Sequence, residues 1–159
     1  MLKREYGVSN TISTRIGNTM LQEKSLGRAK EGTGTSVNFS GTWINELQST
    51  VTLTQINGVL SGLYESAVSA DGKSTKGDLQ GYADGDLIAF VVHGRDFRAI
   101  TTLVGQFDPK AQRDTINSLW QMTSQVPAGD EWASINAGIR FFYKAIAASP
   151  RAGAFLTAP

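Results

Sequence analysis

Apolar and polar residues alternate in short runs from Phe39 onward, and turn residues separate the runs. The stretch from Val51 to Thr54 alternates strictly, and the Asn57-Gly58 pair that follows it is typical of a tight hairpin turn. Alternation with a period of two places successive side chains on opposite faces of a strand. The pattern therefore predicts strands of an antiparallel sheet.

The expected strands are short and follow one another without a helical pattern between them. They cover residues 41–50, 51–54, 59–68, 79–82, 87–92, 97–107, 115–123 and 135 or 138 to 146. Eight strands with short connections predict an all-β fold, an eight-stranded antiparallel up-and-down β-barrel, because closure removes the exposed edges of a sheet. The interior of such a barrel is wide enough for one small ligand, and Trp43 on the first strand is expected to plug its base under Lys144.

The regions outside the strand pattern have a different character. Residues 1–38 lack strong periodicity and carry six Lys/Arg and three Asp/Glu, while residues 147–159 are rich in Ala and Pro. We expect an N-terminal arm at 1–38, mobile or loosely docked, a β-barrel at 39–146 and a C-terminal tail at 147–159. A short excess of positive charge is more typical of a solvated arm than of a nucleic-acid tail.

Composition narrows the classes of function. The 159 residues carry a formal net charge of +1, which gives no general attraction to nucleic acid or to an anionic membrane. With no Cys and one His, disulfides and His/Cys zinc sites are excluded. No apolar run has the length of a membrane-spanning helix. Residues 1–17 lack the apolar core of a secretory signal, which leaves the compartment open.

A catalytic interpretation has little support in the sequence. His93 and Asp96 lie close together in a chain with many Ser residues, but a Ser-His-Asp site is defined by geometry that closeness in sequence does not provide. A single His at the end of a strand is more typical of a surface position. We expect neither enzyme activity nor a cofactor.

Four polar side chains stand at even spacing on two of the expected strands. Asn45 and Ser49 share one face of an extended strand, and Tyr64 and Ser66 share one face of a later strand. Polar groups that face a barrel interior are costly unless they form hydrogen bonds. A polar ligand would satisfy all four.

The runs at 41–50 (GTWINELQST) and 62–68 (GLYESAV) resemble the avidin and streptavidin family, which binds biotin. The resemblance extends from Phe39 to Lys144, about two-thirds of the chain. It implies that Asn45, Ser49 and Tyr64 donate hydrogen bonds to the ureido oxygen of biotin, and that Ser66 accepts one from a ureido N–H. Three such donors would stabilise negative charge on one oxygen.

The resemblance also assigns aromatic positions. Trp120 matches a Trp that packs on the ligand ring, and Trp132 matches a Trp that each subunit contributes to its neighbour's pocket, which favours a homotetramer. The family has a third Trp that this chain lacks. Phe90 takes its place if the following loop has the streptavidin length, and Gly94 if it has the avidin length; we prefer Phe90, which keeps an aromatic ring on a strand.

Three further residues complete the expected pocket walls. Thr101 matches a hydroxyl that approaches the sulfur of biotin, and Val68 and Met122 match apolar wall positions. Ala99 replaces a hydroxyl that the family uses for the ligand carboxylate, and Leu103 replaces a further aromatic residue.

Arg140 is the largest departure from the family, which has Asp or Asn here to accept a ureido N–H. Arginine has only donors, and two opposed donors in a dry pocket cost about 1–3 kcal/mol. Arg140 has the strand parity of Phe142 and Lys144, so it is expected on their face. Either it pairs with Glu65, Asp96 or Asp130 and alters the pocket, or the pocket selects an acceptor-bearing or anionic ligand.

The sequence thus predicts a non-covalent biotin-binding protein of the avidin type, with reduced affinity and no cofactor. Its expected partners are biotin or a related small molecule and further copies of itself, with neither nucleic acid nor membrane. Two alternatives stay open: an avidin-like barrel for a different small ligand, and an oligomeric interaction module whose arm at 1–38 recruits a partner. Family members are commonly secreted.

Overall fold

The computed structural model describes residues 25–29, 35–67 and 72–146. Residues 25–29 form a short turn in which the N–H of Arg28 donates to the carbonyl oxygen of Ser25 at 3.0 Å. The predicted arm at 1–38 falls mostly outside the described residues, and the predicted tail at 147–159 falls wholly outside them.

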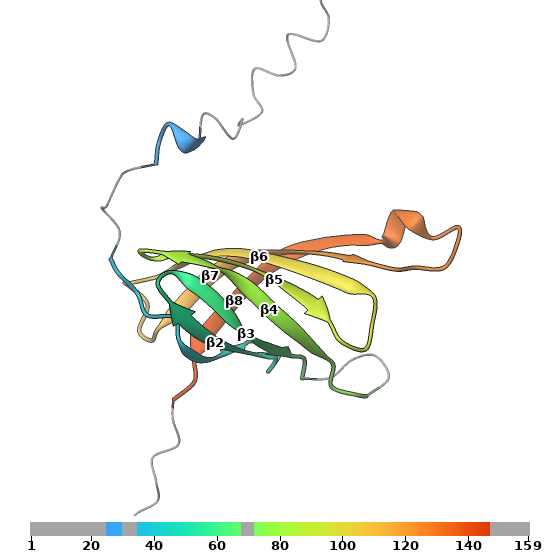
Figure 1. Ribbon diagram of the computed structural model, residues 1–159, viewed down its shortest axis with the longest axis horizontal. Coiled ribbons are helices and arrows are strands. Elements are labelled where there is room, and N and C mark those ends of the chain that lie inside the picture. The colour runs from blue at the N-terminus through green and yellow to red at the C-terminus, as the bar shows by residue number, and fades with distance from the viewer. Residues whose placement is uncertain (1–24, 30–34, 68–71, 147–159) are drawn as a thin grey trace, which may run out of the picture. The chain divides into compact units, whose positions relative to one another are not determined.

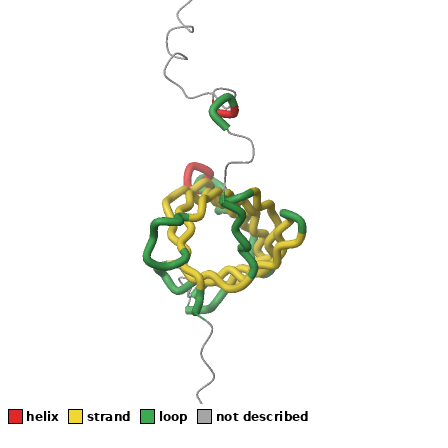
Figure 2. The backbone as a smooth tube through the Cα atoms, turned by 90° about the vertical axis from the view of Figure 1, so that its left-hand side faces the viewer, coloured by secondary structure: helices red, strands yellow, loops and turns green. Residues whose placement is uncertain are grey.

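Eight antiparallel strands form a closed barrel in which each strand pairs with its sequence neighbours and the last pairs with the first. They are β1 (Gly41–Asn45), β2 (Thr50–Ile56), β3 (Val59–Glu65), β4 (Lys76–Asp84), β5 (Leu87–Gly94), β6 (Ala99–Phe107), β7 (Thr115–Ser124) and β8 (Ile135–Lys144), with a 3₁₀ turn η2 (Glu131–Ala133) before β8. Figure 1 labels strands β2 to β8, and Figure 2 shows the strands as a ring. The predicted all-β, eight-stranded up-and-down barrel is confirmed.

Burial alternates along the strands, because one face of each strand packs inside the barrel and the other meets solvent. In β5, Ile88, Phe90 and Val92 are buried, whereas Leu87 and Val91 between them are exposed. The alternation of residues in the sequence therefore matches the alternation of inward-facing and outward-facing side chains in the barrel.

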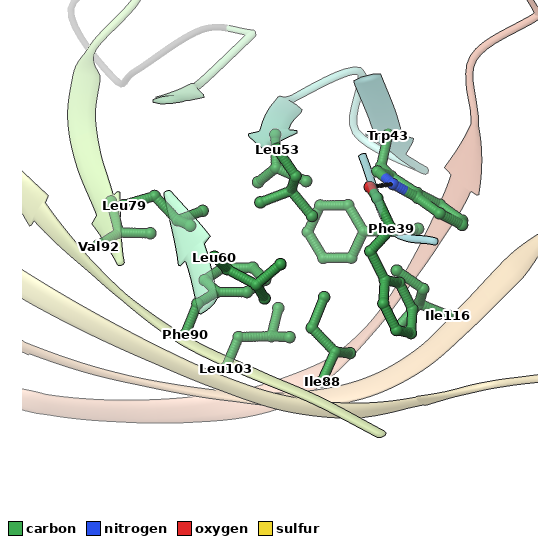
Figure 3. Close-up of a cluster of buried hydrophobic side chains, with 12 residues drawn as sticks. Phe39, Trp43, Leu53, Leu60, Leu79, Ile88, Phe90, Val92, Leu103 and Ile116 are labelled. Carbon is green, nitrogen blue, oxygen red and sulfur yellow. Dashed lines mark hydrogen bonds between the residues drawn. The ribbon is translucent and has the colours of Figure 1, made fainter. Parts of the chain in front are cut away.

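Aromatic and aliphatic side chains form one buried cluster inside the barrel (Figure 3). We call the end of the barrel that holds Phe39 and Trp43 the base. Phe39 and Trp43 are 0% and 1% exposed, and the Trp43 Nε1–H donates to the Phe39 carbonyl oxygen at 2.8 Å. Lys144 on β8 lies over the Trp43 ring, with its Nζ 4.7 Å from the ring centroid, and donates to the Ser40 carbonyl oxygen at 2.6 Å. The expected cover of Trp43 by Lys144 is confirmed.

The turn between β2 and β3 has the conformation that its sequence predicts. Asn57 and Gly58 both lie in the left-handed region, with φ of 50° and 78°, as a two-residue hairpin of the Asn-Gly type requires. A Cβ on Gly58 would lie 2.9 Å from the carbonyl oxygen of Ala83. A side chain at this position is therefore disfavoured both by the positive φ and by this close contact.

Two strands end earlier than the sequence predicts. β1 ends at Asn45, and the chain turns back through 46–49 with Gln48 in the left-handed region at φ 68°. β3 ends at Glu65, so Ser66 follows the strand. The prediction that Asn45 shares an extended strand with Ser49, and Tyr64 with Ser66, is therefore wrong. The turn at 46–49 contains neither Gly nor Pro, and its one signal in the sequence was Asn45, because an Asn side chain can accept a hydrogen bond from the backbone two residues on.

Candidate ligand-binding site

A cavity of about 240 Å³ opens at the end of the barrel opposite the base. Apolar side chains make most of its surface, and a few polar groups reach it from β1, β3, β6, β7 and β8. Seven predicted site residues line it: Asn45, Tyr64, Phe90, Thr101, Trp120, Met122 and Arg140. Ser49, Ser66 and Trp132 are not among its lining residues, and Val68 lies outside the described residues.

Asn45 is 4% exposed, and the two halves of its amide have different surroundings. Its Oδ1 accepts hydrogen bonds from the backbone N–H groups of Leu47 and Ser49, at 3.0 and 2.8 Å. Within the described part of the chain, no hydrogen bond engages its Nδ2. The side chain therefore fixes the turn after β1 with its oxygen and offers an N–H donor to the cavity.

The two predicted serines hold the rim of the cavity together. The Ser49 Oγ accepts from the backbone N–H of Ala67 at 3.2 Å. The Ser66 Oγ accepts from the backbone N–H of Thr75 at 2.9 Å and lies 2.8 Å from the Thr75 hydroxyl. These hydroxyls join the turn after β1, the end of β3 and the approach to β4.

Trp120 owes its position to two residues of β8. It pairs with Gly138 across the β7–β8 ladder, and a Cβ on Gly138 would lie 2.8 Å from the Trp120 Nε1. Glycine therefore leaves the space that the indole occupies. The guanidinium carbon of Arg140 lies 5.8 Å from the indole centroid, within the range of a cation–π contact.

Phe90 and Gly94, the two positions considered for the missing Trp, both line the cavity. Phe90 is buried and belongs to the hydrophobic cluster of the barrel. A Cβ on Gly94 would lie 2.6 Å from a ring carbon of Phe97, so the Phe97 ring occupies the space beside Gly94. Sequence analysis missed Phe97 as a lining residue; an aromatic residue directly after the Gly94-Arg95-Asp96 turn was the available signal.

Other lining residues were not predicted as site residues. Val51, Val92 and Phe142 were expected only as part of strands, and Thr75 lies just before β4. Ala99 and Leu103, recognised in the sequence as departures from the family, also line the cavity.

Arg140 faces the barrel interior together with Phe142, as strand parity predicted. Its Nη1–H donates to the Glu46 Oε1 at 2.8 Å, and the Glu46 Oε2 accepts from the backbone N–H of Phe141 at 3.4 Å. The prediction that Arg140 pairs with Glu65, Asp96 or Asp130 is wrong. Its partner is the carboxylate of Glu46, in the turn after β1. Glu65 instead lies 3.6 Å from the Lys76 Nζ.

The surroundings of Glu46 shift its ionisation. Partial burial by itself raises the pKa of the carboxyl group. The hydrogen bonds from Arg140 and from the backbone N–H groups of Glu46 and Phe141 outweigh that effect, with a smaller contribution from the Arg140 charge, and leave the pKa of Glu46 below its ordinary value. Glu46 is therefore negatively charged at neutral pH.

Trp132 lies on η2, in the connection between β7 and β8 that projects from the barrel as the orange tip in Figure 1. Its side chain is 84% exposed. Glu131 beside it accepts from the backbone N–H of Gly129 at 3.0 and 3.1 Å, which lowers the pKa of Glu131 and ties the connection together. A large aromatic ring is thus presented outside the cavity of its own barrel.

Features of other kinds of site are missing from the part of the chain that the structure describes. His93 is exposed and does not line the cavity. Residues 25–29, 35–67 and 72–146 contain no cluster of three or more His, Asp or Glu side chains placed to hold a metal ion. The same ranges contain no helix with the length and hydrophobicity needed to span a membrane.

Comparison with known proteins agrees with the fold. The sequence profile of the avidin family matches residues 33–145. Among solved structures, the crystal structure of Xenavidin superimposes with a TM-score of 0.60 at 24% sequence identity, over 70% of this chain and 100% of the other. At 24% identity the structural similarity supports the fold alone. Membership of the avidin family rests on the profile match.

Proposed function

Because this chain belongs to the avidin family, we propose that it binds biotin non-covalently in its barrel cavity, with an affinity below the family norm. The observation that carries the proposal is the placement of Asn45 and Tyr64 on the wall of a largely apolar cavity. An apolar pocket with a few fixed polar groups is the usual form of a small-molecule site.

The side chains of the cavity suit the two parts of biotin. The Nδ2 of Asn45 and the hydroxyl of Tyr64 are donors for the ureido oxygen. Trp120, Phe90 and Met122 offer apolar surface to the fused rings and the alkyl chain. Hydrogen bonds and apolar contacts of this kind hold a ligand without any chemical reaction, as in a binding protein.

Two features of the chain argue for reduced affinity. Arg140 offers donors where a ureido N–H needs an acceptor. The Ser66 Oγ is already engaged by the N–H and hydroxyl of Thr75 and does not line the cavity. Each unsatisfied donor in a dry site costs about 1–3 kcal/mol, which amounts to about one or two decades of affinity.

We further propose that the protein is a homo-oligomer, with a tetramer favoured. Large apolar side chains are exposed on the outer face of neighbouring strands, including Val59, Tyr82, Val91 and Val104. Contiguous apolar surface of this kind is typical of an interface. In such an assembly Trp132 would reach the pocket of a neighbouring subunit.

Calorimetric titration of the full chain with biotin tests the proposed function. We expect saturation near one biotin per chain, and tighter binding by the Arg140→Asn variant. Asn is preferred to Asp because a carboxylate at position 140 would face Glu46. The Arg95→Asn variant is the matched control, since Arg95 forms a similar ion pair with Asp78 (2.6 Å) and does not line the cavity.

Absence of both heat and thermal stabilisation at millimolar biotin would reject biotin as the ligand. Equal affinity of the wild type and Arg140→Asn would show that Arg140 is not the cause of any weakness in binding.

A further inference from the structure

We propose that the cavity prefers a ligand with a carboxylate head group on an apolar body, and that Arg140 determines this preference. The inference rests on the proposed function in taking the same cavity as the binding site. It differs in the chemistry of the favoured ligand, because a ureido group presents N–H donors beside its oxygen and a carboxylate presents acceptors alone.

The first argument is the charge of the cavity wall. Among the described residues that line the cavity, Arg140 alone carries a formal charge at neutral pH, and no carboxylate lines it. Glu46, which pairs with Arg140, is not a lining residue, and its side chain is 37% exposed. The Arg140 side chain is 27% exposed, so solvent partly screens the attraction between the two charges.

The second argument is the balance of donors and acceptors among the lining side chains. The Asn45 oxygen is occupied by two backbone N–H groups, which leaves its Nδ2 as a donor. The Thr75 hydroxyl is engaged by Ser66. Arg140 can only donate hydrogen bonds, while the hydroxyls of Tyr64 and Thr101 can donate or accept them. A ligand rich in acceptors finds more partners here than a ligand rich in N–H groups.

The third argument is the fixed position of the guanidinium. One of its N–H groups is held by Glu46, and the Trp120 ring lies beside it. A guanidinium has five N–H donors, so donors remain for a second carboxylate, and their planar arrangement suits two parallel bonds to it. Because Arg140 is already held in place, little side-chain entropy is lost when a ligand binds.

The remainder of the wall suits an apolar body. Phe90, Val92, Phe97 and Leu103 line the cavity, and none of them carries a polar side-chain atom. Together with the cation at Arg140, this arrangement is complementary to an aryl or alkyl carboxylate.

The test compares acids with their amides, which have nearly the same shape and no charge. The full chain is titrated with phenylbutanoate, phenylbutanamide, biotin and the primary amide of biotin. Because a hydrogen bond to a charged group is worth about 1.5–3 kcal/mol, we expect phenylbutanoate to bind about tenfold or more tightly than phenylbutanamide. Biotin and its amide report whether the ureido group is accepted beside Arg140, and no preference between these two is expected. The Arg140→Met variant is expected to bind acid and amide equally, and the Arg95→Met control is expected to keep the wild-type ratio.

The outcomes separate this inference from the proposed function. Binding of biotin together with equal affinities for phenylbutanoate and phenylbutanamide overturns the inference and leaves biotin binding in place. Binding of phenylbutanoate without binding of biotin supports the inference and rejects biotin as the ligand. Binding of none of the four compounds rejects both. The wild-type comparison needs no variant, so it decides the matter even if Arg140→Met fails to fold.

Discussion

At the scale of single residues, the oxygen and the nitrogen of the Asn45 amide have different surroundings. Its oxygen accepts from two backbone N–H groups, while no hydrogen bond within the described residues engages its nitrogen, which we propose for the ligand. We expect Asn45→Ala to lower the free energy of unfolding by about 1–3 kcal/mol, because the buried N–H of Ser49 loses its acceptor. Urea denaturation measures this.

Asn45→Asp is the companion variant, because it keeps an oxygen acceptor and removes the amide donor. It is expected to retain more stability than Asn45→Ala while weakening any ligand that binds through an acceptor at this point. Equal stability of the two variants would show that the Oδ1 contacts do not hold the turn.

The lowered pKa of Glu46 makes a prediction about pH. A carboxyl group whose pKa is lower in the folded than in the unfolded chain adds stability above the unfolded pKa, and this contribution is lost as the pH falls through the folded value. The Glu46→Gln variant should therefore be less stable than the wild type at pH 7, and the difference should vanish at a pH below the folded pKa of Glu46. Because the pair is partly exposed, the difference is expected to be small. Denaturation curves at both pH values measure it, and a difference independent of pH would exclude the ion pair as its source.

Sequence reasoning about Arg140 succeeded in one respect and failed in another. Its inward direction was predictable, because alternation along a strand is strict. Its partner was not, because Glu46 lies 94 residues away and no local pattern relates the two positions. Long-range pairing depends on the closure of the barrel between β8 and β1.

At the scale of elements, the β7–β8 ladder positions Trp120 through the missing side chain of Gly138. The Gly138→Ala variant places a Cβ 2.8 Å from the indole nitrogen, so the ring must move. We expect weaker ligand binding and a shifted tryptophan emission spectrum, with the barrel still formed. Fluorescence and calorimetry measure these effects, and Ala137→Ser, at a neighbouring exposed position, is the control. An unchanged spectrum together with unchanged affinity would contradict this account.

Turns show why some boundaries were predictable and others were not. The Asn57-Gly58 turn needs two left-handed residues, and these two residue types adopt that conformation most readily. The turn at 46–49 is held instead by the Asn45 side chain, and its left-handed residue is Gln48. Because this turn is held by two hydrogen bonds to one side chain and contains neither Gly nor Pro, its sequence was interpreted as a continued strand.

At the scale of the whole molecule, the exposure of Trp132 predicts that binding depends on assembly. If Trp132 completes the pocket of a neighbouring subunit, Trp132→Ala should weaken ligand binding by about tenfold or more, since large aromatic residues dominate interface energies. The stability of the barrel should change little, because the side chain is 84% exposed in its own chain. Calorimetry gives the affinity and light scattering gives the mass, with Trp132→Phe as the conservative control. Wild-type affinity in Trp132→Ala would place the ring outside any pocket.

The packed base of the barrel has a consequence for kinetics. Phe39 and Trp43 fill one end of the described barrel. A ligand in the cavity would therefore enter and leave through the opposite, open end. Differences in affinity between related binding sites arise mainly from dissociation rates. If a ligand binds in the cavity, we expect its dwell time to depend on the residues that line the open end, which include Thr75, Gly94 and Phe97. Changes there can tune the lifetime of the complex without disturbing the core that folds the barrel.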